Sequence, residues 1–286
     1  MNSKTENLIN ITRNFRDKCD TYKKKIIEDN PNIFFVYNPL NYAWEPHKYY
    51  LEKYGNLGAK TIIMGMNPGH GMGNTGIPFG CPEKVRTYLQ ITDLEVKHPS
   101  EMHPKRKIFG LKYEKPEISG KRIWGLIEEI YGLPLIAFKN IFVLNHFPLW
   151  MFNEAGQNIT PDKLKSSSSK EIFEICNKYL IDIIQILDCE NVIGVGKYAQ
   201  KMAYTAVNDA KIESVIIKEI PHPSPANPLA NRDKGKVWNK ICQEVIKKTT
   251  DWLLSIPLGS NLMKQNPKRL FATAISVFTL GFIGRI

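Results

Sequence analysis

Residues 65–80 read GMNPGHGMGNTGIPFG, a run of glycines and prolines that directly follows the apolar, strand-prone segment 61–64. Within this run, Asn67 and Phe79 are the large side chains best suited to contacting a ligand. Glycines lack a Cβ atom and let the backbone approach a flat ligand closely, while the two prolines restrict the loop and keep Asn67 and Phe79 in place. The pattern predicts a pocket for a flat molecule, bordered by an amide and an aromatic ring.

Two further segments can supply polar groups to the same pocket, VLNHFPL at 143–149 and PHPSPANPLAN at 221–231. Asn145 ends a strand-like segment, and its carboxamide offers both donors and an acceptor to the edge of a base. His222 stands among rigid prolines, where it can donate a hydrogen bond to a developing anion or act as an acid. Each residue also has a structural alternative: a core aromatic for Phe79, an amide serving its own loop for Asn145, and a capped loop histidine for His222. We favour the pocket because the three segments occur together.

The elements that must position these residues alternate between strands and helices. Strand candidates are 61–64, 141–144, 191–195 and 215–220, and helical periodicity marks 121–131, 169–187 and 197–207. This alternation predicts an α/β protein of three layers, α/β/α, with a central four-stranded parallel sheet. Ligands of such sheets bind outside the carboxyl ends of the strands, so we expect Asn67, Asn145 and His222 to converge there.

Residues 1–250 are predicted to form a single catalytic domain that begins with a helix, since apolar residues recur at positions 8, 11, 15 and 19. Residues 251–286 are predicted to be an accessory tail of unknown role. The uncharged part of its sequence LFATAISVFTLGFIGRI is shorter than the roughly 20 residues that cross a bilayer. A packed terminal strand or helix is favoured over an interfacial anchor because the flanks lack a broad basic cluster, and no stable membrane association is expected.

The composition indicates which binding partner and which cellular compartment to expect. The formal net charge of +11 over 286 residues favours a polyanionic partner, with nucleic acid ahead of an anionic membrane surface. The five cysteines lack the spacing of zinc or iron–sulfur sites, so we expect free thiols, a reducing compartment and no metal. The N-terminus has no apolar core of signal-peptide type, which indicates a cytoplasmic protein.

One motif favours a different function. Gly71, Gly73 and Gly76 match the GxGxxG spacing of a dinucleotide-binding loop, as in an oxidoreductase. The context is unfavourable, because Pro78 interrupts the helix that should follow the strand and the nearby acidic residues lie in a charged loop. We therefore expect no cofactor.

Two other groups of residues are expected to have no specific role. The first comprises the histidines His70, His98, His103 and His146, which have no metal-ligand pattern and are expected at the surface or in loops. The second comprises the basic clusters 105–107, 121–122 and 163–170, which are expected to be solvated faces that attract phosphate only in a general way.

In this order and at these separations, the three segments resemble the single-strand-selective monofunctional uracil-DNA glycosylases of the uracil-DNA glycosylase superfamily. The resemblance covers roughly residues 30–248 and rests on GMNPG with TGxPFG and on HPSPxNPxAN. Further matches lie at 119–125, 156–161 and 192–196. The family has an α/β/α fold with a central parallel sheet and excises uracil and some oxidised pyrimidines without a metal. The resemblance implies a metal-free monomer whose partner is single-stranded DNA, with duplex DNA left open, and which is nucleoid-associated in a bacterium or nuclear in a eukaryote.

The resemblance also implies a role for each matching residue. Asn67 would position the attacking water, and Phe79 would stack on the base. Asn145 would read the N3 and O4 edge of the base, and His222 would stabilise negative charge at O2. The other substrate-binding residues implied are Met66, through its backbone, Gly69 and Met72. No lysine lies in the three segments, so no Schiff base and no lyase activity are expected.

The loop from His222 to Asn231 is expected to enter the duplex while the target base is flipped out. The predicted DNA-binding residues are Pro223, Ser224, Pro225, Ala226, Asn227, Leu229 and Arg232. Several family members carry a basic residue where this chain has Ala226, so Leu229 or Arg232 would have to fill the gap. The loop around His70 is also shorter than the family pattern, so tolerance of 5-substituted uracils does not carry over. A damaged-DNA-binding protein of the same fold that has lost its chemistry is the alternative.

Overall fold

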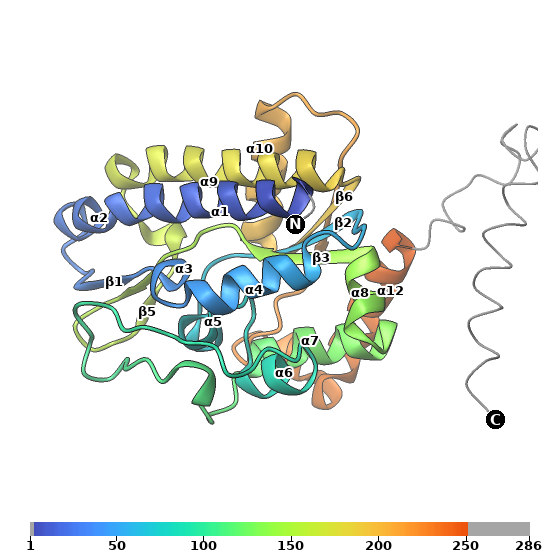
Figure 1. Cartoon of the computed structure of the whole chain (residues 1–286), viewed down its shortest axis with the longest axis horizontal. Coiled ribbons are helices and arrows are strands. Elements are labelled where there is room, and N and C mark those ends of the chain that lie inside the picture. Colours follow the sequence, from blue (N-terminus) through green and yellow to red (C-terminus); the bar gives the residue numbers. More distant parts are fainter. Residues whose placement is uncertain (1–2, 251–286) are drawn as a thin grey trace, which may run out of the picture. The chain divides into compact units, whose positions relative to one another are not determined.

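The structure is a computed structural model that describes residues 3–250, and Figure 1 shows the arrangement of its elements. Residues 1–250 form one compact unit. The tail predicted for residues 251–286 lies outside the described residues.

The central sheet contains four parallel strands in the order β3-β2-β6-β7. Their bounds are β2 (Thr61–Gly65), β3 (Ile141–Asn145), β6 (Asn191–Val195) and β7 (Ile216–Ile220). Strands β2 and β3 are buried along their whole length, as their continuous apolar sequences predict for a sheet covered on both faces. The predicted parallel sheet is confirmed, and each strand lies within one residue of its predicted bounds.

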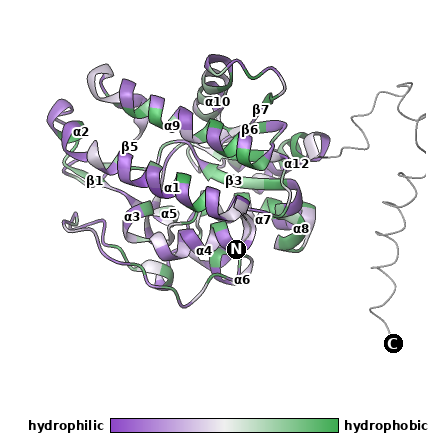
Figure 2. Cartoon of the chain, turned by 45° about the horizontal axis from the view of Figure 1, so that its top comes forward, coloured by the Kyte–Doolittle hydropathy of each residue, from purple (hydrophilic) through white to green (hydrophobic). Residues whose placement is uncertain are grey.

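Helices cover both faces of this sheet, which confirms the predicted α/β/α layers (Figure 1). On one face lie α1 (Ser3–Thr21), α9 (Ser166–Leu187) and α10 (Lys197–Asp209). On the other lie α4 (Trp44–Tyr54), α7 (Ile118–Tyr131) and α8 (Pro134–Asn140), and α12 (Lys236–Thr250) packs against α7 and β7. Figure 2 shows hydrophobic strands at the centre and hydrophilic stripes on the outer sides of α1 and α9.

The helices form where the sequence carries an apolar stripe. Helix α9 buries Ile172, Cys176, Tyr179 and Ile183, a spacing of three to four residues that places them on one side. Both α7 and α9 begin three residues before their predicted starts. In α7 the reason is a cap: the Glu117 carboxylate accepts hydrogen bonds from two backbone N–H groups of the first turn.

A second, smaller sheet was not predicted. It is antiparallel and contains β1 (Phe35–Tyr37), β4 (Trp150–Phe152) and β5 (Asn158–Ile159) in the order β1-β4-β5. Strands of two or three residues are too short to show an alternating pattern. Aromatic side chains form its core, and Trp150 lies against the backbone of Gly73 in the glycine-rich segment.

Short elements complete the described chain. They are α2 (Lys23–Asp29), α3 (Pro39–Tyr42), α5 (His70–Thr75), α6 (Pro82–Thr87), α11 (Pro228–Asn231) and the 3₁₀ turns Gly110–Lys112, Pro161–Lys163 and Arg232–Gly235. Within residues 3–250, no helix combines the length and the apolar character needed to span a bilayer.

Candidate active site

The predicted site residues gather at the carboxyl ends of the parallel strands. Asn145 is the last residue of β3 and pairs with Gly65 at the end of β2. Asn67 follows β2 by two residues, and His222 follows β7 by two residues. In the order β3-β2-β6-β7, β7 lies two strands from β2, a distance of roughly 10 Å. The structure thus brings these residues to one edge, while their chemical roles remain predictions.

Phe79 and Asn145 meet over the backbone of Gly65. A Cβ atom at Gly65 would clash with Asn145 Oδ1 and would lie 2.6 Å from Phe79 Cζ. Only glycine leaves room for both side chains at this point. The aromatic ring and the carboxamide therefore lie side by side, as is needed to hold one face and one edge of the same flat ligand.

Helix α7 fixes the unusual backbone of Phe79. The φ angle of Phe79 is 50°, in the left-handed region that an aromatic residue rarely adopts. Trp124 Nε1 donates a hydrogen bond of 3.2 Å to the carbonyl of Pro78, and a Cβ atom at Gly120 would clash with the Phe79 carbonyl. The close packing of α7 against residues 78–79 holds the strained conformation in place, which is typical of functional sites.

The amide of Asn145 has only a weak partner. Asn145 Nδ2 donates to the thioether sulfur of Met72 at 3.1 Å, and both residues are buried. A thioether accepts hydrogen bonds poorly, whereas a ligand carbonyl oxygen accepts them well. A carbonyl entering this position would therefore replace Met72 Sδ with a gain in hydrogen-bond energy.

Asn67 lies half-buried in the turn after β2. Its Nδ2 donates to the Pro68 carbonyl at 3.0 Å, while its Oδ1 has no hydrogen-bond partner among residues 3–250. The carbonyl of Met66 accepts a hydrogen bond of 2.8 Å from Phe147 N, which joins this turn to the chain after β3. Gly69 is exposed and has open space around its Cα. Asn67 Oδ1 is thus free to accept a hydrogen bond from water.

The glycine-rich segment is not entirely a loop, which corrects the sequence interpretation. Helix α5 opens at His70, five residues after β2 ends, and stops at Gly76, whose φ is 73°. The expected loop thus contains a short helix, which has only six residues and ends before Pro78. Glycines allow this helix to form here. Gly71 packs directly on the backbone of Gly80, and Gly73 packs directly on the ring of Trp150, so neither position has room for a Cβ atom.

His222 presents a neutral donor. Its Nδ1 accepts a hydrogen bond from Ser224 N at 3.1 Å, so the ring proton is carried by Nε2. Burial lowers the pKa of His222, which keeps the imidazole uncharged at neutral pH. Asn227 Nδ2 donates to the His222 carbonyl at 2.8 Å and fixes the backbone at this residue. The side chain can therefore donate a hydrogen bond without carrying a charge.

Arg122 of α7 anchors the loop that follows His222. Its guanidinium donates to the carbonyl of Pro223 at 2.7 Å and to Asn231 Oδ1 at 3.0 Å. The expectation that Arg122 is a solvated residue was therefore wrong. The family match at 119–125 includes Arg122, but it does not reveal these contacts, since both join residues more than 100 positions apart. Helix α7 thus contacts both halves of the site, the Phe79 loop and the His222 loop.

The predicted DNA-binding residues lie along this loop with graded exposure. Pro225, Ala226 and Arg232 are exposed, Ser224, Asn227 and Leu229 are half-buried, and Pro223 is buried. The loop is braced internally, since Asn231 Nδ2 donates to Pro225 O at 2.6 Å and Ala226 N donates to Ser224 Oγ at 3.2 Å. Its exposed tip, Pro225–Ala226, is therefore presented on a rigid base.

The four histidines without a predicted role differ in burial. His98, His103 and His146 lie in loops, as expected, with His98 exposed and His103 and His146 buried. His146 Nε2 lies 2.9 Å from Asn177 Oδ1, and burial lowers its pKa to about 4. His70 Nε2 lies 2.6 Å from a guanidinium nitrogen of Arg106, and burial followed by that charge lowers its pKa to about 4. In residues 3–250, no three His, Cys, Asp or Glu side chains form a group that could hold a metal ion.

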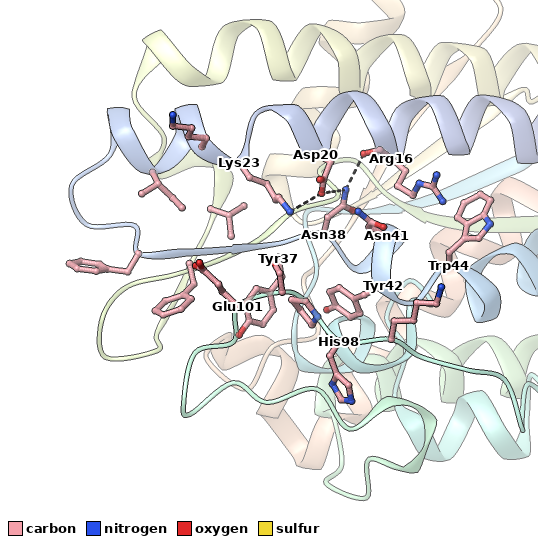
Figure 3. Close-up of a pocket in the computed structure, with 18 of the residues that line it drawn as sticks. Arg16, Asp20, Lys23, Tyr37, Asn38, Asn41, Tyr42, Trp44, His98 and Glu101 are labelled. Carbon is pink, nitrogen blue, oxygen red and sulfur yellow. Dashed lines mark hydrogen bonds and ion pairs between the residues drawn. The ribbon is translucent and has the colours of Figure 1, made fainter.

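A cavity of about 710 Å³ lies away from these residues, between α1, β1 and residues 95–101 (Figure 3). None of the predicted site residues lines it. Asp20 Oδ1 accepts hydrogen bonds from Asn38 Nδ2 at 3.2 Å and pairs with Lys23 at 3.0 Å. Four basic and four acidic side chains line the cavity, so it has no charge preference for a polyanion.

The comparisons with known proteins define the class. The family model of the uracil DNA glycosylase superfamily matches residues 52–244, and the chain belongs to this superfamily. The single-strand selective monofunctional uracil DNA glycosylase of Bos taurus is 37% identical over 213 residues, which cover 74% of this chain and 76% of the relative. The single-strand selective monofunctional uracil-DNA glycosylase of Rattus norvegicus is 37% identical over 210 residues, which cover 73% of each chain. Within the superfamily, the chain therefore belongs to the single-strand-selective monofunctional family.

A solved structure agrees with the fold. The crystal structure of wild-type Pedobacter heparinus SMUG2 superposes with a TM-score of 0.57 and covers 83% of this chain and 98% of its own. The sequence identity is 17%, so this likeness concerns the architecture alone.

Proposed function

We propose that this chain is a monofunctional uracil-DNA glycosylase, which hydrolyses the N-glycosidic bond of uracil in DNA, leaves an abasic site and so initiates base-excision repair. The observation that carries the proposal is the arrangement at the sheet edge. An aromatic ring and a carboxamide meet over Gly65, and an uncharged imidazole donor follows the outer strand. The family of the chain supports the same conclusion.

Phe79 and Asn145 recognise the uracil base. A uracil that has left the base stack lies on the Phe79 ring, and stacking of this kind contributes about 1–3 kcal/mol per base. Asn145 Oδ1 accepts from uracil N3–H, and Asn145 Nδ2 donates to O4 in place of the Met72 sulfur. The carboxamide thereby selects a base with one donor beside one acceptor, which cytosine does not offer in that order.

Bond cleavage uses His222 and Asn67. As the bond between C1′ and N1 breaks, its electron pair moves onto the uracil, and His222 Nε2–H donates a hydrogen bond to O2. Asn67 Oδ1 accepts a hydrogen bond from the water whose oxygen bonds to C1′, the proton that this water loses passes to the solvent, and uracil leaves as the anion. A neutral amide activates water only weakly, so most of the rate gain comes from stabilising the uracil anion.

The proposed substrate is single-stranded DNA bound by a monomer, in the compartment that holds the genome, and whether duplex DNA is also a substrate is left to the test below. A non-catalytic damaged-DNA-binding protein is the alternative. The free Oδ1 of Asn67 and the fixed tautomer of His222 favour the enzyme, because simple binding of a base requires neither.

The test is release of uracil from a labelled oligonucleotide, single-stranded and duplex, with EDTA present. We expect strand breaks only after alkali treatment, and their loss in Asn67→Ala, whose DNA affinity should stay close to that of the wild type. An absence of breaks with uracil, hypoxanthine, xanthine and oxidised pyrimidines would support the non-catalytic alternative. Breaks without alkali would contradict a monofunctional enzyme.

A further inference from the structure

A groove of about 560 Å³ lies between α7 and the start of α12, beside the turn Arg232–Gly235. Its basic lining residues are Lys121, Arg122, Lys234, Lys236 and Lys240, and its one acidic lining residue is Glu129. We name it the α7–α12 groove. In contrast to the balanced cavity of Figure 3, it carries a clear excess of positive charge.

Most of this charge is not neutralised within the protein. Lys234, Lys236 and Lys240 are exposed, and none of them forms an ion pair with a carboxylate among residues 3–250. Lys121 differs, because it pairs with Glu83 at 2.9 Å. Glu129 already accepts hydrogen bonds from Asn239 at 2.6 Å and from Gln243 at 2.9 Å. Three cations are thus left to bind an external anion.

The groove is continuous with the loop that carries His222. Arg122 lines the groove and also donates to the carbonyl of Pro223. Trp238 lies in the groove wall, and its Nε1 donates to the carbonyl of Pro221 at 2.7 Å. A ligand in the groove therefore lies directly beside the loop residues proposed to contact DNA.

We propose that the α7–α12 groove binds the phosphodiester backbone of the DNA strand next to the flipped nucleotide. This inference rests on the proposed function, since a strand that places a base at the sheet edge must leave the site past one side of the His222 loop. A basic groove on one side of that loop fits a repeating row of phosphates, because each lysine can neutralise one of them. The general attraction expected of the basic residues would thus be concentrated in one groove.

The test removes the three unpaired cations together, as Lys234→Gln, Lys236→Gln and Lys240→Gln. The matched control removes the same charge from three exposed lysines that also lack ion pairs and do not line the groove, Lys170, Lys201 and Lys211. DNA affinity is measured from about 50 to 200 mM salt on single-stranded and duplex uracil oligonucleotides. Each phosphate contact contributes about 0.9 to the slope of log K against log salt on duplex DNA and about 0.7 on single strands.

We expect the groove variant to lose about 2.7 of this slope on duplex DNA and about 2.1 on single strands, with the control nearly unchanged. The groove variant should also retain its rate of uracil release at saturating DNA, because its lysines do not touch the reacting atoms. Equal losses in both triple variants, or an unchanged slope in the groove variant, would overturn the proposal. A wild-type protein that releases no uracil would instead refute the function, while the salt slope would still report on the groove.

Discussion

Replacing Gly65 by alanine tests the centre of the proposed base pocket with a single methyl group. The new Cβ atom would clash with Asn145 Oδ1 and approach Phe79 Cζ to 2.6 Å. Strand β2 lies in the middle of the sheet, paired with β3 and β6, so its backbone cannot move away. The two side chains must be displaced instead, and both groups proposed to hold uracil shift at once.

The expected loss follows from the stacking contact and the two hydrogen bonds of Asn145. Stacking on an aromatic ring contributes about 1–3 kcal/mol, and each hydrogen bond about 0.5–1.5 kcal/mol. Their combined loss of about 4 kcal/mol corresponds to roughly a 1000-fold fall in kcat/KM. The assay is single-turnover uracil release over a range of DNA concentrations, with thermal unfolding of the same sample as a check on folding.

Gly125→Ala provides the matched control. Gly125 lies inside α7 and lines the α7–α12 groove, and a Cβ atom there would meet nothing within 4 Å. This variant should keep the wild-type rate at saturating DNA and gain up to about 1 kcal/mol of stability, since alanine favours a helix over glycine. A folded Gly65→Ala protein whose kcat/KM stays within about threefold of the wild type would refute the placement of uracil between Phe79 and Asn145.

Three further predictions concern groups around the pocket. Arg122→Ala should lower kcat at saturating DNA by about tenfold or more, because the Pro223 carbonyl loses its hydrogen-bond donor. Lys121→Ala removes an exposed ion pair with Glu83 and should leave kcat unchanged. Equal effects of the two substitutions on kcat would contradict a positioning role for Arg122. His222→Ala should lower kcat by about 10²–10³ with DNA affinity nearly unchanged, as for the loss of a donor to a developing anion, and a matching loss of affinity would argue against that role. Burial lowers the pKa of His47 and of His146 to about 4, so the unfolded chain binds more protons below pH 6.5 and stability falls as pH falls from 6.5 towards 4. Urea unfolding should show a loss of about 2 kcal/mol per histidine at pH 5, and a pH-independent unfolding free energy would exclude this linkage.

The parallel sheet could be read from the sequence because each strand is a run of consecutive apolar residues bounded by turns. TIIM and IFVL need no long-range information to be recognised as buried strands. The small sheet could not be read in this way, since two or three residues carry no period. Its aromatic core depends on pairing between β1 and β4, which are more than 100 residues apart.

The candidate site was likewise only partly predictable from the sequence. Asn67, Asn145 and His222 each follow a recognisable strand, so the topology alone brings them to one edge. Arg122 and the burial of His146 escaped prediction, because each is defined by a partner far along the chain. The helix α5 was missed for a local reason: glycine and proline ordinarily indicate a loop, and here close packing on Trp150 outweighs that preference.

Different residues are proposed to carry out catalysis and to attract DNA. Burial lowers the pKa of His222 and keeps the imidazole neutral, and a neutral donor held at a partly buried position can stabilise an anion that forms beside it. Neutral amides and an imidazole offer little attraction for a phosphate backbone, so affinity must come from cations elsewhere. Lys234, Lys236 and Lys240 lie where such cations are needed. Substitutions at Asn67 or His222 should therefore change kcat alone, and substitutions of Lys234, Lys236 and Lys240 should change affinity and its salt slope alone. Variants of either group that altered both quantities equally would contradict this division of roles.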